Sequence, residues 1–538
     1  MFACRVALLV GAAAALACGQ TPPASLHGIV RDASTGVPIA DAEIRVLSAV
    51  GGGAQTEATS DAEGLFTLSG LATGPARLRV FHFFLGGDMT QEVTVSADPN
   101  APPVEIRLRT GGHISGRVTD QGGHPLSGVF VAAFKRVYSM GKLRYLGVGG
   151  DDSTRGDGQY YIDGLEAGHA YIIQARLDRT GDAKAISEEP EDPALRKDIP
   201  IPTYYPSADS PERALPVPLE SNDTRDHIDI RMLRSPSYCV SGSADLESLG
   251  LRDGASFMLS DRPPSAGATT GDLGPDGKFR ICDLYPGEFS LAVHPPRQMG
   301  SGLGTASVTI LDRDVDRVTA APAARAVSLT GQVVWDGTPP ALAADDSTLS
   351  LQLSGGPPGP AVSRRFLVPG SFSMQAPLLS GEITLQVSQV PPGAYLKQVL
   401  YNGANLPGAA ATLPPGPGAL LVKLGSDGAR INVKVTDQDG NPAPGASLAV
   451  FPASPDSEST LAATLRAGAA DAQGLWTSPF LAPGRYAVLA TASPLEVSPT
   501  QVSFETVEAL WLARGQWQSV DLTPGSTAPV TLLPVPLR

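Results

Sequence analysis

Hydrophobic and polar residues alternate with a period of two in short runs along most of the chain. The alternation is clear at residues 43–46, 77–80, 105–108 and 384–387, where every second side chain is apolar. Such a run places its apolar side chains on one face of a β-strand. Turn sequences of the types Asp-x-x-Gly and Pro-Gly separate the runs, and no stretch shows a sustained helical period with capping residues. The pattern therefore predicts an all-β chain of short strands packed as sandwiches, with almost no helix.

Two sequence phrases recur along the chain and divide it into units. The first is Ile-Ser-Gly-Arg-Val-Thr-Asp at 114–120, and related versions begin near residues 26, 240, 329 and 431. The second is Gly-Gln-Tyr-Tyr-Ile-Asp-Gly-Leu at 158–165, and it returns in whole or in part at 64–71, 277–284 and 474–476. Because self-similarity marks a tandem array, we predict about five β-sandwich domains. Their expected ranges are 26–110, 111–234, 235–322, a divergent 323–426, and 427–538.

Glycines and aromatic residues hold fixed places in these phrases. A glycine lies inside the opening strand of four units, where it marks a bulge or a close backbone approach. These glycines are Gly28, Gly116, Gly242 and Gly331. An aromatic residue stands two positions after the turn glycine of the second phrase, on the side that the period of two turns inward. These aromatics are Phe66, Tyr160, Phe279 and Trp476, and we expect them at equivalent buried positions.

The first residues resemble an export signal. Arg5 provides a positive charge, and residues 6–16 form an apolar run that is too short to span a bilayer. Ala15-Leu16-Ala17 followed by Cys18 resembles a bacterial lipobox, in which the cysteine is acylated and becomes the mature N-terminus. We therefore predict a signal peptide at 1–17, a tether at 18–25 and lipidation of Cys18. The alternative is ordinary cleavage that leaves Cys18 unmodified.

The net negative charge of the chain makes some classes of binding partner unfavourable. The net charge is −14, and acidic chains without basic stripes repel phosphate backbones and anionic lipids. We therefore expect no nucleic-acid partner, and a membrane association only through the lipid anchor. The expected location is the outer membrane or the cell surface as a lipoprotein, with a periplasmic or secreted soluble protein as the alternative.

Of the four cysteines, Cys4 lies in the leader and Cys18 is the lipidation candidate. That leaves Cys239 and Cys282, and disulfides persist in exported proteins. In the third unit Val240 aligns with the core-facing Leu26, so Cys239 is one residue out of phase and faces away from the core. Cys282 follows the inward-facing Ile281 and is out of phase in the same way. We predict a disulfide between them, with two unrelated thiols as the alternative.

The recurring phrases resemble the carboxypeptidase regulatory-like domain, which is a transthyretin-like β-sandwich also grouped with carbohydrate-binding-like folds. The resemblance is strong in the first, second and fifth units, fair in the third and weak in the fourth. Residues 202–206, 395–399 and 511–522 are similar to segments of long exported bacterial proteins that carry this domain. The resemblance implies a fold and an exported location. It does not imply peptidase activity, because the domain accompanies a peptidase in some proteins without catalysing the reaction.

The sequence offers no catalytic constellation. None of the seven histidines begins His-x-x-Glu, and the sequence contains no His-Glu-x-x-His, Cys-x-x-Cys or Gly-x-Ser-x-Gly. We therefore expect no catalytic residue, no metal site and no cofactor. Asp437 and Asp439 lie in a turn, as do Asp151, Asp152 and Asp157, and calcium binding is an open alternative there. We expect these carboxylates to bond to their own turn backbone instead.

Sugar binding would require exposed aromatic side chains. The weak candidates are Tyr204, Tyr205, Trp511 and Trp517, and the alternative for them is packing between neighbouring units. The leading hypothesis is a non-enzymatic, exported protein that acts as a scaffold, spacer or adhesion module of the cell envelope. The rival hypothesis is a protein that binds extracellular polysaccharide, and a hydrolase with an unrecognised site is a third. The partners would be a polysaccharide or another envelope protein.

Overall fold

The computed structural model describes the chain between residues 24 and 537, with gaps. The described residues are 24–33, 35–49, 57–82, 85, 87–96, 98, 101–139, 141–148, 152–177, 196–221, 223–251, 254–261, 268–296, 302–322, 327–340, 347–354, 361–376, 383–406, 410–413, 417–498 and 501–537. The predicted signal peptide at 1–17 and the lipidation candidate Cys18 lie outside them. Below, the first to fifth segments are the five ranges predicted above, with the first taken from residue 24 so that it includes its whole first strand. Among the described strands, pairing stays inside these ranges, except where β14 meets β19 and where β41 meets β9.

The described chain divides into two compact units. The first unit holds the described residues up to Ser115, together with Tyr161–His169 and Pro218–Asp226. The second unit holds Gly116–Tyr160, Ala170–Val217 and the chain from His227 onward. The first segment therefore belongs to the first unit and the third to fifth segments belong to the second. The strands of the second segment are divided between the two units.

The first segment is a two-sheet sandwich. Its strands are β1 (Ala24–Asp32), β2 (Glu43–Ala49), β3 (Glu57–Thr59), β4 (Leu65–Leu71), β5 (Gly74–His82), β6 (Gly87–Val95) and β7 (Val104–Leu108). One sheet has the order β4-β1-β7 and the other has the order β3-β2-β5-β6. Alternate residues of β1 are buried, as the period of two predicts. The two sheets enclose a core that contains the fully buried Ile44, Leu68, Leu78 and Ile106.

The second segment contains β9, the longest of the described strands. Its elements are β8 (Gly112–Thr119), β9 (Val129–Ser139), β10 (Lys142–Gly147), β11 (Asp152–Ser153), β12 (Gln159–Leu165), β13 (His169–Leu177), β14 (Asp198–Pro200), β15 (Thr203–Tyr204), η2 (Pro211–Arg213), β16 (Val217–Leu219), β17 (Thr224–Arg225) and β18 (Ile230–Arg231). One sheet follows β12-β8-β17, with β18 also on β8, and the other follows β10-β9-β13-β15.

The third segment forms one continuous seven-stranded sheet that folds over its core. After β19 (Arg234–Pro236), its strands are β20 (Tyr238–Ala244), β21 (Ser256–Asp261), β22 (Ala268–Asp272), β23 (Lys278–Leu284), β24 (Gly287–His294), β25 (Gly304–Ile310) and β26 (Val315–Pro322). The order is β22-β21-β24-β25-β26-β20-β23. Phe257, Leu291 and Val293 are fully buried in the core of this segment.

The fourth segment returns to two sheets. Its strands are β27 (Val327–Asp336), β28 (Thr348–Ser354), β29 (Ala361–Leu367), β30 (Gly370–Ala376), β31 (Ile383–Ser388), β32 (Tyr395–Tyr401), β33 (Ala404–Asn405), β34 (Ala410–Leu413) and β35 (Gly418–Gly425). The orders are β30-β27-β35-β32-β33 and β29-β28-β31-β34. As in the other segments, the core consists of buried apolar side chains. This holds although the fourth segment matches the recurring sequence phrases least well.

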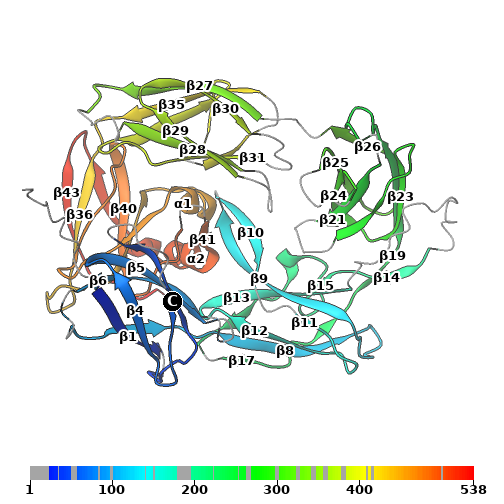
Figure 1. The fold of residues 1–538 in the computed structure, drawn as a ribbon, viewed down its shortest axis with the longest axis horizontal. Coiled ribbons are helices and arrows are strands. Elements are labelled where there is room, and N and C mark those ends of the chain that lie inside the picture. Colours follow the sequence, from blue (N-terminus) through cyan, green and yellow to red (C-terminus); the bar gives the residue numbers. More distant parts are fainter. Residues whose placement is uncertain are drawn as a thin grey trace, which may run out of the picture. The chain divides into compact units, whose positions relative to one another are not determined.

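The fifth segment adds the helices that the sequence did not predict. Its elements are β36 (Arg430–Val435), β37 (Ser447–Pro452), α1 (Glu458–Thr464), β38 (Arg466–Ala469), β39 (Leu475–Thr477), β40 (Gly484–Thr491), β41 (Gln501–Ser503), α2 (Phe504–Leu512), η4 (Ala513–Gln516), β42 (Gln518–Leu522) and β43 (Thr527–Leu532). The sheets are β39-β36-β43 and β38-β37-β40-β42. Figure 1 shows strands throughout the described chain and only short helices, which confirms the predicted all-β class of tandem sandwiches.

Three of the four strand glycines of the first phrase face an aromatic ring across the sheet, and the fourth, Gly116, lies against the backbone of Ile228. Gly28 pairs with Phe66, Gly242 with Phe279 and Gly331 with Phe372. A Cβ atom added at any of these glycines would overlap the ring or a neighbouring carbonyl oxygen. Phe66, Tyr160 and Phe279 are accordingly buried.

The prediction of burial is wrong for Trp476. Its partner across the sheet is Val433, where the other units have glycine, so a side chain occupies the space that the ring would need. The indole instead lies against Gly468 of β38, where it contacts the edge of the core and stays half-buried.

A bulge recurs near the end of the second phrase. Gly70, Gly164 and Asp283 occupy the same place in three units, and all have positive φ, of 81°, 71° and 58°. In the first segment the pairing of β1 with β4 skips Gly70, and in the third the pairing of β20 with β23 skips Asp283. The phrase therefore specifies a backbone bulge as well as a strand.

We expect Gly70→Ala to lower the free energy of unfolding of the first segment by about 1 kcal/mol, because a side chain disfavours positive φ. No atom lies within 4 Å of an added Cβ, so the backbone alone sets this cost. Urea unfolding of the purified chain, followed by hydrogen exchange in β1 and β4, measures it. Gly156→Ala is the control, because Gly156 has open space and no positive φ. Equal stability of both variants would contradict the assignment.

Candidate functional site

The aspartate side chains in the turns accept hydrogen bonds from the backbone N–H groups of the same turns. Asp437 accepts hydrogen bonds from the backbone N–H groups of Asp439 and Asn441, at 2.9 and 2.8 Å. These bonds, with Asn441 contributing most, lower the pKa of Asp437. Asp157 likewise accepts from the Gln159 N–H at 3.1 Å. Among the described residues, no group of three or more His, Cys, Asp or Glu side chains could hold a metal ion.

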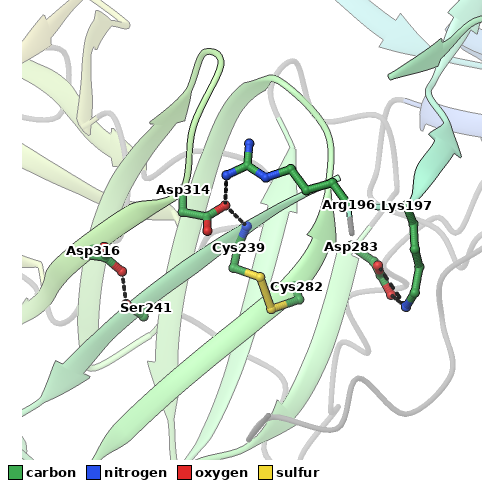
Figure 2. Close-up of a disulfide and its surroundings, with 8 residues drawn as sticks. All are labelled: Arg196, Lys197, Cys239, Ser241, Cys282, Asp283, Asp314 and Asp316. Atoms are coloured by element: carbon green, nitrogen blue, oxygen red, sulfur yellow. Dashed lines mark hydrogen bonds and ion pairs between the residues drawn. A yellow bond between two sulfur atoms is a disulfide. The ribbon is translucent and has the colours of Figure 1, made fainter. Parts of the chain in front are cut away.

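The structure brings Cys239 of β20 and Cys282 of β23 together in a disulfide, with a Cα–Cα distance of 4.0 Å (Figure 2). The pair faces away from the core cluster, to which the neighbouring Val240 and Ile281 belong. Cys239 is only 3% exposed, so the outward face is covered at this point.

The outward cross-strand position of this disulfide is a repeated feature. Ser25 and Ser69 are paired in the first segment at the same place beside the bulge, and their hydroxyl groups are 3.4 Å apart. We call this position the outer pair. Next to it, Ser241 donates to Asp316 at 2.5 Å in the third segment, and Ser115 donates to Asp226 at the same distance in the second. The outer faces of these sheets are therefore linked across neighbouring strands by polar contacts and, in the third segment, by the disulfide.

Two basic residues directly before β14, Arg196 and Lys197, join the second segment to the third. Arg196 lies over the Tyr238 ring at 4.7 Å and pairs with Asp314 at 3.3 Å, and the same Asp314 carboxylate accepts from the Cys239 N–H (Figure 2). Lys197 pairs with Asp283 at 3.3 Å, and β14 pairs with β19 beside them. The disulfide thus lies at the junction where the chain enters the third segment.

A second junction links the second and fifth segments, which we call the clasp. The short strand β41 adds antiparallel to β9, so that Val502 stands opposite Tyr138. The Arg136 guanidinium lies 3.6 Å above the centre of the Phe504 ring, and Tyr138 stacks on the same ring from 6.1 Å. This arrangement combines strand addition with a cation–π contact.

Carboxylates of both short helices complete the clasp. The Tyr138 hydroxyl donates to Glu458 of α1 at 2.9 Å, although 320 residues separate them in sequence. Burial, followed by this hydrogen bond, raises the pKa of Tyr138. Glu505 of α2 accepts from the Ala170 N–H at 3.1 Å. No local sequence pattern signals the clasp, because its partners come from segments that are far apart in the sequence.

Of the four sugar-binding candidates, Tyr204 is buried and the other three are half-buried. Tyr204 is 6% exposed, and its hydroxyl accepts from Gln174 at 2.7 Å. Trp517 meets the fully buried Phe451 edge-on at 4.8 Å and donates from Nε1 to the Leu510 carbonyl. Trp511 lies on α2 beside Trp517, with ring centres 6.3 Å apart, and is half-buried. Tyr205 is also half-buried, and the structure does not combine these four side chains into one exposed surface.

Residues 25–109 match the family model of the carboxypeptidase regulatory-like domain, which agrees with the resemblance in the first segment. No curated protein matches the chain. Among the described residues, no helix combines the length and the apolar character that crossing a membrane requires.

Several solved structures are similar to the chain. The TIE protein of Bacillus anthracis is 10% identical, with 86% of this chain and 71% of that chain covered and a TM-score of 0.16. A minor pilin of Streptococcus agalactiae is 10% identical, with 35% and 95% covered and a TM-score of 0.21. Two B repeat units of the collagen-binding protein of Staphylococcus aureus are 10% identical, with 73% and 97% covered and a TM-score of 0.15. Values this low do not indicate a shared function.

Proposed function

We propose that this chain is a non-enzymatic, exported scaffold or spacer of the bacterial cell envelope. The clasp is the observation that carries the proposal. Strand addition of β41 to β9, together with the contacts of Arg136 and Tyr138, fixes two segments that are far apart in sequence. A chain that serves as a scaffold requires defined contacts between its sandwiches, because flexible linkers would otherwise leave their spacing open.

The use of the polar groups supports a structural role. Asp437, Asp157 and Ser241 bond within the chain at turns and sheet faces, and Glu458 and Glu505 bond across the clasp. An exported location is supported by the disulfide, since such bonds persist in oxidising compartments. We propose anchoring through acylated Cys18. Binding of polysaccharide remains the rival outcome of the test below.

The test is complementation in a strain that lacks the chain, with envelope leakage as the measurement. We expect the wild-type gene to restore the envelope. Cys18→Ala should lose incorporation of a fatty-acid probe, leave the membrane fraction and fail to complement. An Arg136→Ser, Tyr138→Ser double variant, which opens the clasp, should keep the label and also fail.

Arg485→Gln is the matched control, because Arg485 forms an exposed ion pair with Asp521 in the fifth segment, apart from the clasp. It should complement fully. Full complementation by the clasp variant would contradict the scaffold proposal. Saturable binding of the purified chain to a polysaccharide, or turnover of a peptide substrate, would replace it with one of the rival functions. An unlabelled wild type would overturn the anchor alone.

A further inference from the structure

A pocket lies at the junction of the second and third segments, beside the contacts of Arg196 and Lys197. It is a half-open depression, and the space between its walls opens to solvent. Its walls include Arg176 and Pro202 from the second segment, and Leu259, Asp261, Tyr285 and Phe289 from the third.

Arg176, near the end of β13, is the feature that makes this pocket a candidate site. The residue is only 7% exposed, and its guanidinium lies 4.4 Å from the centre of the Phe130 ring. Within the described part of the chain, no carboxylate forms an ion pair with it. A buried cation is costly unless an anion accompanies it, and the face of one aromatic ring compensates only in part. Arg176 lines the pocket, and a guanidinium is suited to a carboxylate in bidentate geometry.

The pocket residues from the third segment determine the rest of the ligand. Leu259 and Phe289 are buried core residues whose side chains reach the pocket and offer an apolar surface. The Tyr285 hydroxyl donates to Asp261 at 2.6 Å, so the phenol is directed toward that carboxylate and not toward a ligand anion. The Asp261 charge disfavours a second negative group near it. The complementary ligand has one carboxylate and an apolar body.

We infer that this pocket binds small apolar monocarboxylates, with the carboxylate on Arg176 and the apolar body against Leu259 and Phe289. The source of the carboxylate is either a free acid or the C-terminus of a peptide with an apolar last residue. Because the walls come from two segments, an occupied pocket stabilises their junction by mass action. The inference is independent of the scaffold role, which would stand without it.

The test is calorimetric titration of the full mature chain with 3-phenylpropionate and with its neutral amide. We expect the acid to bind at least tenfold more tightly than the amide. N-acetylphenylalanine and its amide form the second arm, and tighter binding in that arm assigns the site to peptide C-termini. Hydrogen exchange of β14 and β19 should slow when the acid is bound.

Arg176→Gln should reduce the affinity for the acid at least tenfold and leave the amide unchanged. Ala268→Phe is the second variant, because Ala268 lines the pocket on β22 and a larger side chain there fills it. It should abolish binding without touching Arg176. The exposed Arg485→Gln should bind as the wild type does. Equal binding of acid and amide, no binding of either probe, or unchanged binding by Ala268→Phe, would overturn the inference.

Discussion

Removing the Cys239–Cys282 disulfide is expected to lower the free energy of unfolding of the third segment by about 4 kcal/mol. The bond closes a loop with a sequence separation of 43 residues, and the chain-entropy relation assigns about that value to a loop of this length. The expected effect is a large share of the stability of a typical domain. The core around Phe257 is not altered by the change, because the disulfide lies on the outer side of the sheet.

The measurement compares the wild type with a Cys239→Ser, Cys282→Ser double variant. Hydrogen exchange of β20 to β26 in increasing urea follows the third segment separately, since the whole chain will not unfold in one step. A strong reductant should have the same effect on the wild type and none on the variant. Ser241→Ala controls for local polar changes on the same sheet face. If the free energy of unfolding falls by less than about 1 kcal/mol, the prediction is wrong, because the unfolded segment would then be restricted without the disulfide.

Phe451→Ala is expected to destabilise the fifth segment by about 3–5 kcal/mol, which is usual when a buried phenylalanine leaves a cavity. Phe451 is fully buried on the outer face of the β38-β37-β40-β42 sheet, where it packs edge-on against Trp517. The same cluster contains Leu461 of α1 and Leu510 of α2. Because the two helices carry Glu458 and Glu505, the cavity should also loosen the clasp.

Hydrogen exchange over Glu458–Thr464 and Phe504–Leu512 measures this effect, and the fluorescence of Trp517 reports the loss of packing. Leu512→Ala is the control on the same helix, since Leu512 is 68% exposed, and it should stay within about 0.5 kcal/mol of the wild type. Exchange that is unchanged in both helices of the Phe451→Ala variant would show that the helices are held independently of this cluster.

The strands could be predicted because their cause is local. In β1, and in β4 up to the bulge at Gly70, the period of two decides which residues are buried. The turn glycines mark where the strands end. Helix α2 was missed although Ser503 caps it by accepting from the Thr506 N–H. Its buried residues, Thr506, Val507 and Leu510, cover only a short apolar stripe, and the Val-Ser-Phe run before it is typical of a strand.

The candidate site was less accessible to sequence reasoning. Register arguments could place Cys239 and Cys282 on one face, because both belong to a repeated phrase with a known phase. The clasp of Arg136 on Phe504 and the burial of Arg176 depend on how separate segments meet, and no periodicity records that. Trp511 and Trp517 illustrate the same limit, since a tryptophan in the sequence is equally compatible with an exposed platform and with packing.

The outer pair has an evolutionary and practical consequence. It holds two serines in the first segment and a covalent bond in the third, on the same bulged backbone and outside both cores. Two substitutions at the outer pair can therefore add or remove a disulfide in one unit, and the hydrophobic core does not have to repack. An array of this kind can adjust the resistance of each member separately to heat, reductants or mechanical pulling. In longer arrays designed from these units, the outer pair offers the same choice between two serines and a disulfide.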